Sequence, residues 1–141
     1  MTFQEKLRAA AAQNHSLLCV GLDPDQNQLP ASVRDRDNPT LNFLKHLIDA
    51  TADLVCAYKP NFAFFGALGE RGWPTLKATL EHIPPSIPVL VDAKVGDIGN
   101  TAEHYARMFF EVLGADALTV NPYMGRDAVA PFLAYRDKGV F

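Results

Sequence analysis

Short apolar runs alternate along the chain with stretches in which apolar residues recur at helical spacing. The runs at residues 16–21, 55–60, 86–94 and 115–123 predict four β-strands. They are largely apolar throughout, which is typical of strands covered on both faces in a parallel sheet. The last two residues, Val140 and Phe141, predict the beginning of a fifth strand.

Helices are predicted between these strands. Thr2 and Glu5 have the spacing of a capping box, which predicts a helix over residues 2–13. After a polar loop, apolar residues close to a helical period predict a helix over 40–54 with Thr40 as its N-cap. The remaining helices are predicted at 61–72, 73–83, 100–114 (ending at Gly114) and 125–139 (despite Pro131). Strands that alternate with helices indicate an α/β fold with a parallel sheet.

Composition and charge narrow the function classes. The chain has 141 residues, of which 48% are hydrophobic, and its formal net charge is −3. We expect no nucleic-acid partner, because this charge gives no basic face. No apolar run approaches the roughly 20 residues of a membrane helix, and the mixed charges of residues 1–15 are unlike a signal peptide, so we expect no membrane partner. Cys19 and Cys56 lie in apolar runs without metal-ligand spacing, which favours reduced core thiols in a cytoplasmic protein.

Charged and polar residues stand where each predicted strand ends. The carboxyl ends of parallel strands share one edge of a sheet or one mouth of a barrel, and ligands bind there. A single charge of this kind is often only a solvated strand end, but charges that end successive strands of one sheet favour a site. The residues at these ends are Asp23, Lys59, Asp92, Lys94, Asp97 and Asn121. Asp92 and Lys94 are two positions apart, which predicts that both side chains point into the barrel interior.

Four segments of this chain resemble the orotidine 5′-monophosphate decarboxylase family. "VLVDAKVGDIGNTA" resembles the family signature D-x-K-x-x-D-I followed by threonine, although Val95 stands where relatives often have arginine. "LLCVGLDPD" and "AYKPNFAFFGALG" resemble the motifs of its first and second strands. "TVNPYMGRDAV" resembles the fourth-strand region of the subfamily of longer bacterial chains, type 2.

The resemblance implies a (β/α)₈ TIM barrel and a homodimer. It also implies a carbon–carbon lyase that needs no cofactor and no metal. The substrate would be orotidine 5′-monophosphate, and its decarboxylation to UMP would serve de novo pyrimidine biosynthesis.

Site residues follow from the same resemblance. Lys94 would donate a proton to the pyrimidine carbon that loses CO₂, and Asp92 would lie beside the departing carboxylate. Lys59 and Asp97 would complete an alternating Lys-Asp-Lys-Asp network. Such a network suits the chemistry, because a lysine near carboxylates stays protonated and fixed charges need little reorientation as charge develops.

Four residues would contact the ribose. Asp23 and Lys59 would bind its hydroxyl groups within one subunit. Asp97 and Thr101 would reach into the site of the partner subunit.

The length of the chain limits these expectations. A complete barrel takes roughly 250 residues, so residues 1–141 are expected to form the N-terminal part of one barrel domain, about four strands and the start of a fifth. The later loops, which bind the substrate phosphate in this family, would be absent. We therefore expect a chain of this length alone to expose an open sheet edge, to associate or aggregate, and to be close to inactive.

Two alternatives stay open. One is a sugar-phosphate decarboxylase or aldolase of the same barrel superfamily, which also has D-x-K-x-x-D and would require Mg²⁺. The other is a half-barrel without catalytic activity, whose remaining property is association with a second copy or a complementary half.

Overall fold

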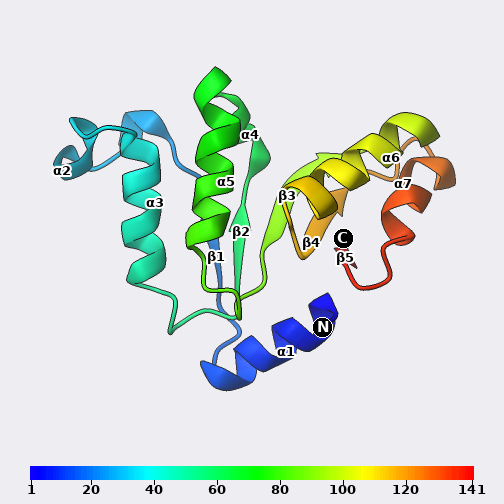
Figure 1. The fold of residues 1–141 in the computed structure, drawn as a ribbon, viewed down its shortest axis with the longest axis horizontal. Coiled ribbons are helices and arrows are strands. Elements are labelled where there is room, and N and C mark those ends of the chain that lie inside the picture. Colours follow the sequence, from blue (N-terminus) through cyan, green and yellow to red (C-terminus); the bar gives the residue numbers. More distant parts are fainter.

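The computed structural model describes residues 1–141 and contains a parallel sheet whose strands follow one another in chain order (Figure 1). Strand β1 pairs with β2, β3 with β4, and β4 with β5, all in parallel. Isolated parallel bridges join the two groups, one from Tyr58 to Val89 and one from Asn61 to Asp92. The strands are β1 (Cys19–Leu22), β2 (Ala57–Pro60), β3 (Leu90–Val95), β4 (Ala117–Val120) and β5 (Gly139–Val140).

Helices connect successive strands, as the sequence pattern predicts. In Figure 1 they lie along the sheet, while α1 lies across the ends where the strands begin. The helices are α1 (Phe3–Gln13), α2 (Ala31–Arg34), α3 (Pro39–Asp49), α4 (Phe62–Gly66), α5 (Gly72–His82), α6 (Gly99–Arg107) and α7 (Arg126–Leu133), with 3₁₀ turns η1 (Gln26–Gln28) and η2 (Gly69–Arg71). The final turns after α6 are a π-helix, η3 (Met108–Val112). The expected α/β half-barrel is confirmed.

The start of α3 differs from the prediction. Asn38, with φ 47°, is the N-cap, and its side-chain oxygen accepts a hydrogen bond from the Leu41 amide at 3.2 Å. Thr40 lies inside the first turn and is 2% exposed, so its prediction as the N-cap is wrong. The physical reason is that Pro39 is suited to the first helical position, which places the cap one residue before it.

Helix ends also differ from the predicted bounds. Helix α3 ends at Asp49 and α7 at Leu133, several residues earlier than the hydrophobic pattern suggested. The predicted loop before α3 contains the short elements η1 and α2. Gly114 follows η3 with φ +76°, a conformation that suits glycine and ends the helix as predicted.

The two faces of the sheet differ in chemistry. Helices α3, α5, α6 and α7 pack against one face, and the shared core contains Leu44, Ile48, Tyr58, Leu76, Val91, Phe109, Leu118 and Phe132. Because side chains alternate along a strand, the neighbours of these strand residues face the other side, which is the barrel interior. Lys59, Asp92 and Thr119 occupy such positions, so the polar groups are segregated from the core.

Helix α1 is joined to the segments that precede two strands. The predicted capping box is confirmed, since Thr2 and Glu5 exchange hydrogen bonds at the start of the helix. The Phe3 amide donates to the Asp137 carbonyl at 2.8 Å, just before β5. At its other end, the Asn14 side chain donates to the Val55 carbonyl at 2.8 Å, just before β2. The strand starts are therefore tied together, which leaves the opposite ends free for a site.

Both cysteines are free thiols. Cys56 is buried, as predicted, but Cys19 is exposed, so its prediction as a core residue is wrong. Cys19 lies on the outermost strand β1 at a position that faces away from the helices, where a short apolar run does not imply burial. No helix has both the length and the apolar character needed to cross a membrane.

The close approach of α4 and α5 generates a prediction about stability. A Cβ atom built on Gly72 would lie 1.9 Å from the Phe65 carbonyl oxygen, so Gly72→Ala should force the two helices apart. We expect this substitution to lower the free energy of unfolding by about 1–3 kcal/mol. Urea unfolding followed by circular dichroism measures this change.

Gly66→Ala is the matched control. A Cβ atom on Gly66 would meet no atom within 4 Å, and this residue ends α4. We expect a change of less than about 1 kcal/mol, in the stabilising direction. Equal effects of the two substitutions would show that helix contact is not what requires Gly72.

Candidate active site

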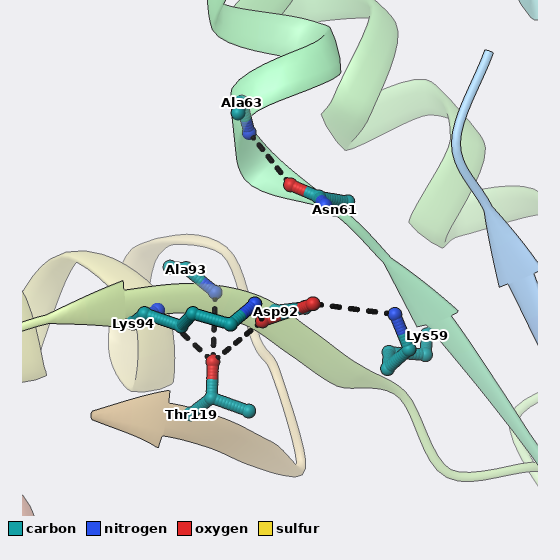
Figure 2. A network of polar contacts seen from close by, with 7 residues as sticks. All are labelled: Lys59, Asn61, Ala63, Asp92, Ala93, Lys94 and Thr119. Atoms are coloured by element: carbon teal, nitrogen blue, oxygen red, sulfur yellow. Dashed lines mark hydrogen bonds and ion pairs between the residues drawn. The ribbon is translucent and has the colours of Figure 1, made fainter. Parts of the chain in front are cut away.

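Asp92 is the centre of the candidate site. Its side chain is 10% exposed and lies in β3, facing the barrel interior. One carboxylate oxygen, Oδ2, accepts a hydrogen bond from Lys59 Nζ at 3.3 Å, and the other, Oδ1, accepts one from Lys94 Nζ. Figure 2 shows the two lysines approaching the carboxylate from different sides, Lys59 from β2 and Lys94 from β3 itself.

Strand β3 is irregular where it carries these charges. Val91 is opposite Leu118 and Val95 is opposite Val120, so the three residues between Val91 and Val95 face Thr119 alone. Lys94 has φ +48°, in the left-handed region that non-glycine residues rarely adopt. The side chains of Asp92 and Lys94 meet, as their spacing predicts, but they do so in a bulge and not in a regular strand.

Thr119 is a member of the site that the sequence interpretation missed. Its hydroxyl donates to Asp92 Oδ1 at 2.9 Å and accepts hydrogen bonds from the amides of Ala93 and Lys94 at 3.0 and 2.9 Å. Thr119 lies within the quoted segment "TVNPYMGRDAV", but a threonine inside a strand is ordinary. Because Leu118 is apolar and adjacent, the sequence indicates only that the Thr119 side chain lies on the opposite face of the sheet.

The surroundings of Asp92 favour its charged form. Burial by itself would raise the pKa of this carboxyl group. Hydrogen bonds from Lys94, Thr119 and Lys59, with the charge of Lys59, outweigh burial and lower the pKa of Asp92 below its usual value. The site therefore holds a partly buried carboxylate that remains ionised at neutral pH.

The two lysines remain accessible to a ligand. The Lys59 side chain is 33% exposed and the Lys94 side chain is 67% exposed. Both amino groups are thus held by one carboxylate while part of each faces open space at the carboxyl ends of the strands. This arrangement can bind an anion or deliver a proton to a group placed over the inner face.

Asp97 lies apart from this network. Its Oδ1 accepts a hydrogen bond from the Ile98 amide at 2.7 Å, and it forms no ion pair with either lysine of its own chain. The loop that carries it is held against the end of β4, where the Asn121 amide donates to the Val95 carbonyl at 2.8 Å. The structure therefore brings three of the four expected network residues together and leaves Asp97 outside.

Two of the four expected ribose contacts, Asp23 and Thr101, are also separate from Asp92. Asp23 is exposed directly after β1, and Thr101 is half-buried in the first turn of α6. The Thr101 amide donates to the Asn100 side chain at 2.8 Å. Both residues stand at carboxyl ends of the sheet, but no hydrogen bond joins them to the lysines.

The side chains that commonly bind metal ions do not cluster in this structure. No group of three or more His, Cys, Asp or Glu side chains is arranged to hold a metal ion. His104 is exposed, and its Nδ1 lies 2.9 Å from the Asn100 carbonyl oxygen.

Comparison with known proteins identifies the family. The family model for the Orotidine 5′-phosphate decarboxylase / HUMPS family matches residues 16–140. The chain belongs to this family. It is 55% identical to orotidine 5′-phosphate decarboxylase of Dechloromonas aromatica, covering 99% of this chain and 52% of that protein. The corresponding protein of Thermomicrobium roseum is 52% identical and is matched over 100% of this chain and 50% of its own.

Solved structures agree with this assignment. The structure of Leishmania donovani OMP decarboxylase superposes with a TM-score of 0.86 at 41% identity, covering 100% of this chain and 52% of that one. The chain thus spans about half the length of the curated relatives it matches. The family relationship inferred from the four segments is confirmed.

The charge state of Asp92 generates a prediction. Since its pKa is lowered in the folded protein, its ionisation contributes stability above the unfolded pKa of about 3.9, and this contribution is lost as the pH falls through the folded pKa. We expect a carbon-13 NMR titration of the Asp92 carboxyl to have its midpoint below that value. Lys59→Met should raise the midpoint, because one donor and its charge are removed.

Lys6→Met is the control for that titration. Lys6 forms an ion pair of 2.8 Å with Asp116 near the other ends of the strands, so the change in charge is the same but the location differs. It should leave the midpoint of Asp92 in place. An equal rise in both variants would mean that net charge, and not the contact with Lys59, lowers the pKa.

Proposed function

We propose that this protein catalyses the decarboxylation of orotidine 5′-monophosphate to UMP. The observation that carries the proposal is the ionised Asp92 carboxylate held between Lys59 and Lys94 at the carboxyl ends of the strands. Family membership supports it, since the relatives that match the chain are named orotidine 5′-phosphate decarboxylases. A cytoplasmic location is part of this proposal and rests on the two free thiols.

The proposed reaction breaks one carbon–carbon bond. The bond to the carboxylate cleaves, CO₂ leaves, and the electron pair stays on the pyrimidine carbon. That carbanion has no adjacent carbonyl to delocalise its charge, so a fixed cation must stabilise it. Lys94 Nζ provides the cation and then transfers its proton to this carbon, which completes UMP and leaves Lys94 neutral until it is reprotonated by solvent.

Asp92 has two parts in this scheme. It holds both lysines in place before substrate binds, so that little reorientation accompanies the development of charge. It also lies beside the departing carboxylate, where the repulsion between like charges is relieved as neutral CO₂ forms. Both parts require the ionised form, which the lowered pKa of Asp92 supplies.

The ribose would be bound by residues at neighbouring strand ends. Asp23 and Lys59 would contact its hydroxyl groups from β1 and β2, which are adjacent strands. This role uses the exposed part of the Lys59 side chain, whose remaining contact is with Asp92.

We further propose that the protein acts as a homodimer in which Asp97 and Thr101 enter the site of the other subunit. In support, Asp97 forms no ion pair with a lysine of its own chain. Exposed apolar side chains also stand on the loops after β3 and β4, including Ile98 at 55%, Tyr123 at 93% and Met124 at 51% exposure. A partner covering these loops would bury that apolar surface.

Substitution of the proposed proton donor tests the activity. Because the chain spans about half the length of its relatives, the test uses the protein as its complete gene encodes it. We expect Lys94→Ala to abolish loss of absorbance of orotidine 5′-monophosphate while binding of UMP, measured by calorimetry, is largely retained. Turnover of the parent protein should persist in EDTA.

Lys77→Ala is the matched control, since Lys77 is exposed on α5 away from the site. It should keep the turnover of the parent protein. Decarboxylation by Lys94→Ala within about tenfold of the parent would exclude Lys94 as the proton donor, because general acid catalysis contributes more than this. A requirement for Mg²⁺ would favour the sugar-phosphate alternative.

A mixture of two inactive variants tests the shared site. Asp97→Ala and Lys94→Ala subunits, mixed in equal amounts under conditions that allow exchange, form hybrid dimers in which one of the two sites has neither lesion. We expect the mixture to recover about a quarter of the parent activity. A mixture no more active than its separate components would place Asp97 in the site of its own subunit.

A further inference from the structure

The strongest unassigned feature is the hydroxyl group of Thr119. It lies on β4 beside the bulge of β3 and points toward Asp92, Ala93 and Lys94, as Figure 2 shows. We propose that Thr119 is a positioning residue that sets the direction of the Lys94 side chain and the orientation of the Asp92 carboxylate. This inference rests on the proposed decarboxylase function but concerns a residue to which that proposal gives no role.

The register of the sheet creates the need for such a residue. Between the pairs Val91–Leu118 and Val95–Val120, β3 has three residues and β4 has one. A regular ladder pairs residues one to one, so the backbone of β4 alone cannot match all three. The side chain of that single residue, Thr119, reaches across the mismatch to the amides of Ala93 and Lys94.

The hydroxyl uses its full hydrogen-bonding capacity on β3. A hydroxyl group has one donor and two acceptor positions. Thr119 accepts from two consecutive amides, at 3.0 and 2.9 Å, which leaves its hydrogen for Asp92 Oδ1 at 2.9 Å. The direction of that hydrogen is therefore determined by the backbone of the bulge. An alkyl side chain of the same shape, such as valine, cannot make any of the three contacts.

The bonded amides include that of Lys94, whose backbone is strained. Lys94 has φ +48°, a conformation that persists only where its surroundings hold it. The Thr119 oxygen holds the Lys94 amide, and the same oxygen positions the carboxylate that binds Lys94 Nζ. One hydroxyl thus constrains Lys94 at both its backbone and, through Asp92, its amino group.

Two substitutions separate this role from simple packing. Thr119→Val keeps the shape and loses the hydroxyl, whereas Thr119→Ser keeps the hydroxyl. In the protein as its complete gene encodes it, we expect Thr119→Val to lower kcat by about 10- to 100-fold with KM within about threefold. Thr119→Ser should restore most of kcat. The acid limb of the pH–rate profile should move to higher pH in Thr119→Val, because Asp92 loses a donor that favours its charged form.

Thr79→Val is the control for loss of a buried hydroxyl. Thr79 is fully buried in α5, where its hydroxyl donates to the Thr75 carbonyl at 2.7 Å. This hydrogen bond lies within one helix and involves no residue of β3. It should leave kcat and the pH profile unchanged. A kcat for Thr119→Val within about twofold of the parent, or an equal loss in Thr119→Ser, would overturn the proposal.

Amide hydrogen exchange followed by nitrogen-15 NMR tests the role of Thr119 independently of activity. In Thr119→Val, exchange of the Ala93 and Lys94 amide protons should accelerate, while that of Tyr58, whose amide donates to the Pro88 carbonyl, should not. If the parent protein does not decarboxylate orotidine 5′-monophosphate, the proposed function fails. The role of Thr119 in positioning Lys94 would still be supported by this exchange pattern, and it would be overturned by unchanged exchange at both amides.

Discussion

The site depends on one constraint, namely that a carboxylate nine-tenths buried must be surrounded by donors if it is to stay charged. Asp92 satisfies it with two ammonium groups and one hydroxyl, drawn from three adjacent strands. Each donor reaches Asp92 only if its strand stays paired in the observed register. The pairing of β2, β3 and β4 therefore determines the charge state of the site. Removal of any one donor would leave the others to offset the cost of burial.

The same constraint explains why the sheet has its irregular point here. The bulge and the left-handed φ of Lys94 occur in the same three residues that bring Lys94 Nζ to Asp92. Strain of this kind is stable only within rigid surroundings. The core on the helical face, which includes Val91 and Leu118 beside the bulge, and α1 across the strand starts supply that rigidity.

Much of this arrangement was predictable from the sequence, and the exceptions have physical causes. Apolar runs placed the strands, and the charges at their ends placed Lys59, Asp92 and Lys94 together. Thr119 was missed because hydrophobic periodicity reports which face a residue occupies and carries no information about register, and a three-to-one mismatch is a property of two strands together. The N-cap of α3 is Asn38 and not Thr40, two residues earlier than predicted. Asn38 caps the helix with its side chain and Pro39 takes the first helical position, and hydrophobic periodicity detects neither effect.

The site of one chain carries an excess of positive charge. Within one chain the network holds two lysines and one aspartate, a surplus of one positive charge. An expected second carboxylate, Asp97, is turned to the backbone of its own loop and leaves that surplus unmatched. The lysine side chains that carry it are 33% and 67% exposed, so an anion can reach them at the carboxyl ends of the strands. The proposed Asp97 carboxylate of a second subunit would neutralise this surplus. The substrate carboxylate would then add one negative charge, which moves to the pyrimidine carbon as CO₂ departs and is met there by the proton of Lys94.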